Sequence, residues 1–248
     1  MNPRAAVLRR ARPLLGTLVE VGVFAPGLDT QAAVDAAFAA VAEAQACLSR
    51  FDANSDIARF NALRRGERLT VRPITRQVLA AAHELRAATA AAFDISLGSA
   101  PDGWALRGAE LDKLSDDACL DLGGIGKGHA VDLAVQTLMA HGVAAGWVNA
   151  GGDLRTFGNV DTPVQLRDES TGGARAFATL RNGAFATSHF GPESRSQLTT
   201  RTSSPPRAHA SVAAPLCLWA DALTKVVALS GDTSHPLLAR YGAAAWLH

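Results

Sequence analysis

The chain has 248 residues, a net charge of +1 and a hydrophobic content of 48%. This length allows one large domain or two small ones, with enough apolar residues for a sizeable core. The charge balance excludes a general electrostatic attraction to nucleic acid or to an anionic membrane surface, and the three scattered cysteines argue against a disulfide framework or a cysteine-based zinc site.

The N-terminal segment, residues 1–16, is basic but has neither the apolar run nor the small-residue cleavage site of a secretory signal peptide. No cysteine near the start offers a site for a lipid. The chain also lacks a run approaching the about 18 apolar residues that a membrane-spanning helix needs. We therefore expect a cytoplasmic protein without a membrane span.

The first predicted element is a strand at residues 15–24, in which three valines alternate with polar or small residues. A turn at Pro26 and Gly27 follows. Thr30 is then suited to cap a helix that runs to Leu48, with apolar residues at helical spacing on its inner face.

A second helix start is predicted at Ser55, whose hydroxyl can accept hydrogen bonds from backbone N–H groups. Asp56 follows in the first turn, where a negative charge is favourable, and the short helix is expected to end near Asn61. Apolar residues at helical spacing predict a longer helix over residues 75–91.

The most distinctive stretch of the sequence is Leu120–Asp153. It begins with Asp121 and the glycine-rich run Gly123–Gly128, and a helix follows in which apolar residues recur every three or four positions. Gly142 is suited to end that helix in a left-handed conformation. A short strand at residues 145–149 then leads into a second glycine turn.

Two interpretations of the run Gly123–Gly128 remain open from the residues alone. Glycines let a ligand approach the backbone closely, N–H groups at a helix start attract anions, and Lys127 adds a positive charge, which together favour a phosphate or pyrophosphate site. The alternative is a glycine-rich turn before an ordinary core helix. The spacing matches neither a Walker A loop nor a clean dinucleotide-binding fingerprint.

The C-terminal half predicts mostly short elements. Three strands separated by turns are expected at residues 163–167, 176–180 and 184–188. The chain is expected to end with a short helix to about Tyr241 and an apolar strand at residues 243–247.

Two motifs give a family resemblance. Asp-Leu-Gly-Gly-Ile-Gly-Lys-Gly-His-Ala-Val-Asp at residues 121–132, then a helix and Val-Asn-Ala-Gly-Gly-Asp at residues 148–153, resembles the signature of the ApbE family, the FAD:protein FMN transferases. Further blocks resemble the family in the expected order, from about Arg12 to Leu229. The resemblance implies an α+β fold, with residues 1–248 in a single compact domain that has a mixed or antiparallel sheet, packed helices and FAD in a central cleft.

The resemblance also implies cofactor contacts, residue by residue. The positions that match the family's FAD-binding residues are Leu15, Phe51, Ala92, Phe93, Asp94, Asp121, Lys127 and Leu198. Lys127 is the expected phosphate partner and Asp121 the expected hydrogen-bond acceptor, while the ring of Phe51 suits stacking on a purine or flavin face. For Leu15 and Phe51, a place in the hydrophobic core remains an alternative.

The family binds Mg²⁺ through a backbone carbonyl and through an Asp and a Thr one helical turn apart. The resemblance places the carbonyl at Gly124 and the Asp at Asp221, but Lys225 replaces the Thr. Asp221 and Lys225, which share a helix face, are the expected catalytic residues. An ammonium is not a metal ligand, so Lys225 either takes the place of the metal charge or forms an ordinary ion pair, and Asp221 can still bind Mg²⁺ through waters.

A second departure affects the family's His-Ile-Ile-Asp-Pro-x-Thr-Gly block, whose His is thought to take part in transfer. This chain has Ser196 at that position and matches the block only loosely. His189 and His209 are candidates to replace the lost base, although a lone histidine is more often incidental.

The resemblance predicts an FAD:protein FMN transferase. Such an enzyme cleaves FAD at its pyrophosphate, attaches FMN to a Thr or Ser of a partner flavoprotein through a phosphoester bond, and releases AMP. The implied acceptor motif is Asp-x-x-Ser/Thr-Gly-Ala-Ser/Thr. Because of the departures, two alternatives stay open: a non-catalytic FAD-binding paralogue, and an FAD pyrophosphatase that yields FMN and AMP.

Overall fold

A computed structural model of the chain describes residues 7–25, 27, 29–167, 173–190 and 209–248. Its helices are α1 (Thr30–Leu48), α2 (Asp56–Ala62), α3 (Pro73–Ala88), α4 (Gly126–Ala140), α5 (Cys217–Ser230) and α6 (Pro236–Arg240). Its strands are β1 (Val7–Leu14), β2 (Thr17–Phe24), β3 (Arg68–Thr70), β4 (Trp104–Arg107), β5 (Glu110–Lys113), β6 (Gly146–Ala150), β7 (Asp153–Phe157), β8 (Thr162–Arg167), β9 (Ala174–Leu180), β10 (Ala184–His189), β11 (His209–Ala214) and β12 (Ala244–Leu247).

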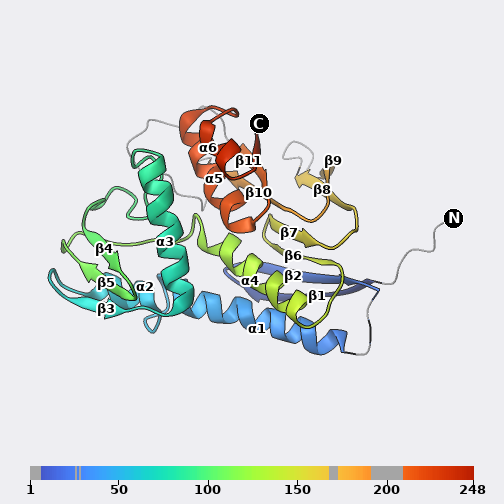
Figure 1. Cartoon of the computed structure of the whole chain (residues 1–248), viewed down its shortest axis with the longest axis horizontal. Helices are drawn as coiled ribbons and strands as arrows, with labels where there is room; N and C mark the ends of the chain where they lie inside the picture. Colours follow the sequence, from blue (N-terminus) through green and yellow to red (C-terminus); the bar gives the residue numbers. More distant parts are fainter. Residues whose placement is uncertain (1–6, 26, 28, 168–172, 191–208) are drawn as a thin grey trace.

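The centre of the fold is a sheet in the order β1-β2-β6-β7-β10-β11-β12, in which the described strands pair antiparallel. Helices α1, α4 and α5 lie together along this sheet, with α4 packed against both of the others (Figure 1). The core fills the space between helices and sheet, where the three valines of β2 are at most 2% exposed. Antiparallel strands with one face covered by helices confirm the α+β class.

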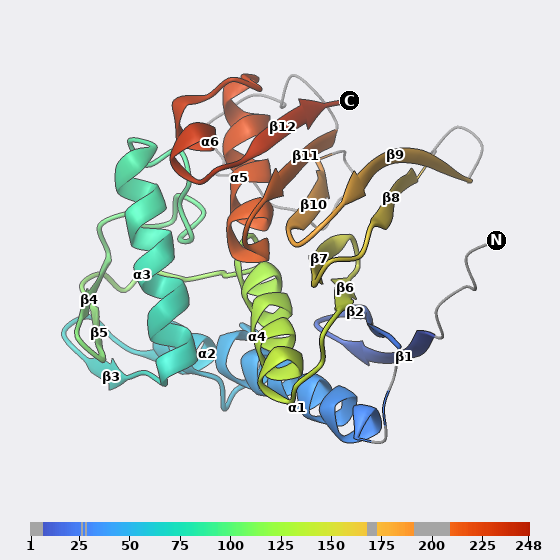
Figure 2. The ribbon, with the colours of Figure 1, turned by 45° about the vertical axis from the view of Figure 1, so that its right-hand side comes forward.

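Two smaller sheets flank this centre. Strands β3, β5 and β4 form one antiparallel sheet, which lies with α2 and α3 at one end of the molecule (Figure 1). Strands β8 and β9 form a hairpin that extends from the other side (Figure 2). In the described part of the chain, none of the helices combines the length and the apolar run that a bilayer crossing requires.

The predicted helices agree well with the structure, with one cap assigned wrongly. Helix α1 ends at Leu48 as predicted, Ser55 caps α2 through its side chain, and Gly142 follows α4 at φ +78°. Thr30 is not the cap of α1: it is the first helical residue, and its hydroxyl instead accepts a hydrogen bond from the N–H of Gly27, at 2.7 Å. This hydrogen bond stabilises the preceding turn and does not cap the helix.

Strand β1 was not predicted, because its sequence lacks an apolar face. Most of its residues are exposed, and three of them are arginines. The strand is held by its pairing with β2 along its whole length. A charged edge strand of this kind also discourages pairing with other chains.

Candidate functional site

A cleft of about 370 Å³ lies where the β1–β2 turn, the end of α1 and the loop before α4 meet. This volume lies within the usual range for ligand pockets. Four of the residues predicted to contact a cofactor line it, from segments far apart in the sequence: Leu15, Phe51, Asp121 and Lys127. The fold therefore brings half of the predicted cofactor-binding set together.

Phe51 projects into solvent at the mouth of this cleft. It is 84% exposed, so the alternative of a core phenylalanine is wrong. Its backbone N–H donates to the hydroxyl of Ser49, which fixes the turn after α1. An exposed ring on a fixed turn offers a face for stacking.

Arg50 is a cleft residue that the sequence did not reveal. Its guanidinium lies 4.8 Å from the centre of the Phe51 ring, and its Nη1 is 3.1 Å from Oδ2 of Asp121. Arg50 thus connects the predicted stacking residue with the predicted hydrogen-bond acceptor. The only sequence signal was a cation directly before the aromatic residue.

Leu15 occupies the tight turn between β1 and β2. Its φ is +55° and that of Gly16 is +69°, as in a two-residue hairpin turn that requires left-handed conformations. For a leucine this conformation costs about 1–3 kcal/mol. Leu15 is half-buried and packs on the core while it also lines the cleft, so both interpretations of this residue hold in part.

The loop before α4 satisfies most of its own N–H groups. Those of Ile125 and Gly126 donate to the carbonyl of Leu122, and that of Gly123 donates to Oδ1 of Asp121, at 2.7 Å. Within the described residues, the N–H groups of Leu122, Gly124 and Lys127 are the ones left without an acceptor. The loop therefore offers fewer N–H groups to an anion than its glycine content suggested.

Beneath the cleft lies a buried cluster of two lysines and two aspartates. Lys225 forms an ion pair with Asp221, and Lys127 forms one with Asp153. Nζ of Lys127 also lies 3.8 Å from Oδ2 of Asp221. Both carboxylates are at most 1% exposed, so the four charges compensate one another inside the protein.

The shifts of pKa in this cluster follow from burial and from the opposing charges. Burial alone would raise the pKa of Asp221, but Lys127 and Lys225 hold it below its ordinary value. Burial raises the pKa of Asp153 to about 6, with Asp221 acting in the same direction. For Lys127, the two carboxylates outweigh burial and raise its pKa above the ordinary value. Asp221 is therefore the carboxylate that stays ionised most firmly.

Asp132 on α4 holds α5 in place above this cluster. Its carboxylate accepts hydrogen bonds from the N–H groups of Cys217 and Leu218, both at 2.9 Å, and contacts Arg155 at 2.7 Å. Burial raises the pKa of Asp132, and Arg155 opposes that shift. Asp132 caps the start of α5 from outside the helix, which directs Asp221 toward α4.

Gly128 permits the close contact between α4 and α5. A Cβ added there would lie 2.3 Å from the carbonyl oxygen of Cys217, whereas one added at Gly126 would meet no atom closer than 3.5 Å. The N–H of Gly128 also donates to Oδ2 of Asp221, at 3.2 Å. The glycine is therefore required by packing at this one position of the loop.

Gly128→Ala is expected to lower the free energy of unfolding by about 1–3 kcal/mol through overpacking. Gly126→Ala is the matched control, and it should keep or slightly raise stability because alanine favours a helix by about 1 kcal/mol over glycine. Urea denaturation of both variants checks this. Equal stability of the two variants would contradict the proposed packing.

The residues present around Asp221 do not fit a magnesium ion. Oδ1 of Asp221 is paired with the ammonium of Lys225, and Oδ2 accepts from the N–H of Gly128. The side chain of Lys225 also crosses Gly124, because a Cβ added there would lie 3.2 Å from Cε of the lysine. Among the described residues, no group of three or more His, Cys, Asp or Glu side chains is placed to hold a metal.

The other predicted cofactor residues lie away from the cleft lining. Ala92 is exposed and Phe93 is buried, while Asp94 accepts hydrogen bonds from Ser96 and Gly98 within its own turn. This turn lies beside the cleft, since the N–H of Asp121 donates to the carbonyl of Ile95 at 2.8 Å. Their roles stay predictions.

Leu198 and Ser196 lie outside the described residues. The two histidines proposed to replace the family base are placed, and they stack on each other at 4.4 Å between ring centres. They line a separate cavity of about 760 Å³. Ser188 on β10 faces α5, and its neighbour His189 points to the opposite face of the sheet, because side chains alternate along a strand. This places both histidines apart from Asp221 and Lys225.

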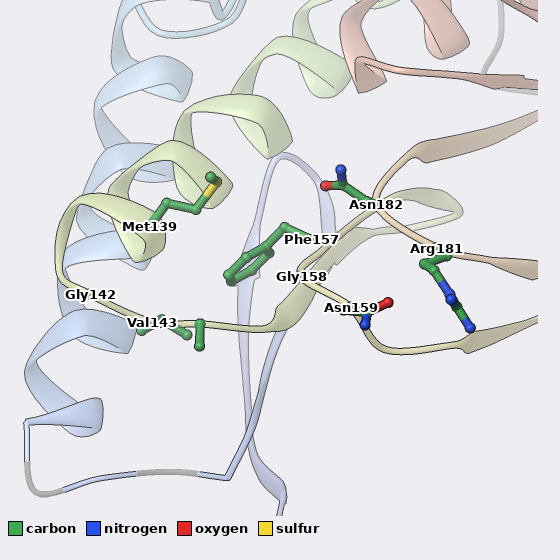
Figure 3. Close-up of a pocket in the computed structure, with 9 residues that line it drawn as sticks. Met139, Gly142, Val143, Phe157, Gly158, Asn159, Arg181 and Asn182 are labelled. Carbon is green, nitrogen blue, oxygen red and sulfur yellow. The ribbon is translucent and has the colours of Figure 1, made fainter.

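His129, in the first turn of α4, is buried, and burial lowers its pKa to about 4. It is therefore neutral near pH 7. A third cavity, of about 680 Å³, lies at the other end of α4 beside Met139 and Phe157 (Figure 3). Met139 is about 18 Å along the helix from Lys127 at 1.5 Å per residue, so this cavity is distinct from the cleft.

Comparison with known proteins adds a family match and several solved structures. A model of the ApbE family matches residues 15–118 and 100–247. The flavinyl transferase ApbE of Pseudomonas stutzeri in its apo form is 22% identical, with a TM-score of 0.81 over 99% of this chain and 91% of that one. No curated protein sequence matches the chain.

Two further structures have the same fold. The ApbE protein of Thermotoga maritima is 19% identical, with a TM-score of 0.84 over 98% of this chain and 94% of that one. The flavin transferase ApbE of Vibrio cholerae is also 19% identical, with a TM-score of 0.76 over 91% of this chain and 87% of that one. At these identities the likeness establishes the fold.

Proposed function

The chain belongs to the ApbE family, and on this premise we propose that it is an FAD:protein FMN transferase. The observation that carries the proposal is the cleft. Three segments far apart in the sequence bring Leu15, Phe51, Asp121 and Lys127 to one cavity. An exposed aromatic ring, a carboxylate and an ammonium are the groups that a dinucleotide with two ring systems and a pyrophosphate requires.

In the proposed complex, the Phe51 ring stacks on a flat face of FAD. The guanidinium of Arg50 lies against that ring and is itself held by its ion pair with Asp121. Lys127 and the N–H groups of Gly124 and Lys127 hold the phosphates at the start of α4. Lys127 is one-third exposed, so its ammonium can face the cleft while it stays paired with Asp153.

The proposed reaction transfers the FMN phosphoryl group to a hydroxyl. The oxygen of a Thr or Ser in an acceptor flavoprotein forms a bond to the phosphorus on the FMN side of the pyrophosphate. The bond from that phosphorus to the bridging oxygen breaks, AMP leaves with this oxygen and its electron pair, and one proton is released. Lys127 and Lys225 would offset the charge that develops on AMP.

Phe51→Ala is expected to weaken FAD binding by about two- to tenfold, since an aromatic stacking contact is worth about 0.5–1.5 kcal/mol. Because Phe51 is 84% exposed, the free energy of unfolding should change by less than about 0.5 kcal/mol. Titration of FAD fluorescence measures the affinity. Met139→Ala removes another exposed apolar side chain far from the cleft and should leave the affinity unchanged; equal affinities of the two variants would contradict the assigned role of Phe51.

Release of AMP tests the proposed reaction against its two alternatives. The protein is incubated with FAD, with and without an acceptor domain that carries the motif Asp-x-x-Ser/Thr-Gly-Ala-Ser/Thr, and nucleotides are separated by chromatography. A transferase releases AMP in step with acceptor modification. AMP without acceptor would identify a pyrophosphatase, and bound FAD without AMP in either mixture would identify a binding protein.

A further inference from the structure

Lysine is rare in this chain, and two of its lysines, Lys113 and Lys225, are buried. Only three of its 24 basic Lys and Arg residues are lysines: Lys113, Lys127 and Lys225. Lys113 is 1% exposed and donates to the backbone carbonyls of Phe60, Asn61 and Ala118. A lysine ammonium is a compact point charge, unlike the planar guanidinium of arginine. The three lysines are therefore compact cations in a chain whose other basic Lys and Arg residues are all arginines.

Lys225, like Lys113, has three hydrogen-bond acceptors, but its set includes a carboxylate and a hydroxyl. Its ammonium donates to Oδ1 of Asp221, to the carbonyl oxygen of Asp221 at 3.0 Å, and to the hydroxyl of Ser188 at 3.1 Å. An ammonium has three N–H donors, so each of them is used. Ser188 is itself held by Thr224, at 2.7 Å between the two hydroxyl oxygens.

The position of this ammonium coincides with the predicted metal site. Its side chain passes over Gly124, and the second oxygen of Asp221 is bound by Gly128. Lys127 lies on the other side, 3.8 Å from Oδ2 of Asp221. Asp221 therefore has two ammonium groups beside it, with the same total charge as one divalent cation.

We propose that Lys225 is a tethered cation that fills the divalent metal site, so that this protein binds its nucleotide without a divalent metal. Asp221 holds the ammonium in place of a metal ion. Lys225 acts as a positioning residue, because it fixes the carboxylate of Asp221. The inference deepens the proposed flavin transfer and rests on it for its functional meaning. The occupancy of the site itself can be tested without FAD or an acceptor.

The test measures binding of Mn²⁺ alone, as a stand-in for Mg²⁺, to the chelator-treated full chain by electron paramagnetic resonance. The wild type is expected to bind no Mn²⁺ at millimolar concentration. Lys225→Thr frees Oδ1 of Asp221 and removes the side chain that crosses Gly124. A carboxylate and a backbone carbonyl are oxygen ligands of the kind that Mg²⁺ and Mn²⁺ prefer. This variant is expected to gain one site, with affinity at least about tenfold above that of the wild type.

Lys113→Met is the matched control, because among the described residues it removes a buried ammonium that has carbonyls and the Phe60 ring as partners and no carboxylate. It should gain no site. Asp221→Asn in the Lys225→Thr background should abolish the new site. One Mn²⁺ bound per wild-type chain, and lost in Asp221→Asn alone, would overturn the proposal even where Lys225→Thr fails to fold.

FAD affinity measured in EDTA and in Mg²⁺ separates this inference from the proposed function. Equal affinity in the two buffers supports the tethered cation. An affinity that rises about tenfold or more with Mg²⁺ would overturn it while leaving the transferase proposal standing. Absence of FAD binding in both buffers would overturn the proposed function, and with it the claim of metal-free nucleotide binding.

Discussion

Replacing Asp221 by alanine is expected to lower the free energy of unfolding by about 3–5 kcal/mol, the usual cost of removing one partner from a buried ion pair. Asp221 is 0% exposed and is the shared partner of Lys225, Lys127 and the N–H of Gly128. Its loss leaves a buried ammonium without a counter-ion. Urea denaturation monitored by circular dichroism measures the change.

Two further variants give this prediction its control. Asp161→Ala breaks the exposed ion pair with Arg181 and should cost less than about 1 kcal/mol. The double variant Asp221→Ala/Lys225→Met removes both charges and should recover part of the loss, because the two residues are coupled. A double variant that is less stable by the full sum of its single changes would show that the pair is not coupled.

Replacing Lys127 by glutamine is expected to lower the rate of flavin transfer by about 10²–10³-fold, the usual effect of losing one preorganised donor to a developing negative charge. Lys127 is the lysine that lines the cleft, and Asp153 and Asp221 keep it protonated by raising its pKa. The rate is measured by single-turnover formation of the flavin-labelled acceptor at saturating FAD. Circular dichroism establishes that the variant is folded.

Lys113→Gln is the control for this rate measurement. Lys113 is buried in β5, in the small sheet, and contacts backbone carbonyls away from the cleft. It should transfer flavin at the wild-type rate. A Lys127→Gln variant that is folded and as fast as the wild type would remove Lys127 from the proposed mechanism.

The sequence predicted best those elements whose apolar spacing reflects burial. Helix α1 ends at Leu48 as predicted. The helix predicted to follow the glycine-rich run ends before Gly142 as expected, but it begins within the run, at Gly126. Helix α3 was placed two residues late because Pro73 starts it, and it ends early because Ala90 and Ala91 adopt left-handed conformations. Strand β1 and the three-stranded sheet were missed, since neither an exposed strand nor very short strands carry a periodic signal.

For the site, the structure places several of the motif residues together, and their roles stay predictions. Phe51, Asp121 and Lys127 line one cleft as a cofactor site requires, and Arg50 was missed because no motif marks it. The pairing of Lys127 with Asp153 joins residues 26 positions apart through tertiary packing. Of the two interpretations of Lys225, the structure shows the ion pair with Asp221; whether it also serves as the cation of the site is the inference proposed above.

The most direct test of the proposed function is whether flavin becomes covalently attached to an acceptor. The protein is incubated with FAD and an acceptor domain carrying the motif Asp-x-x-Thr-Gly-Ala-Thr, in EDTA and in Mg²⁺, beside an acceptor whose final Thr is replaced by Ala. The proteins are then separated on a denaturing gel. The proposal predicts a flavin-fluorescent band on the intact acceptor in both buffers and none on the Ala variant. No fluorescent band in either buffer, with FAD bound to the folded protein, would contradict it.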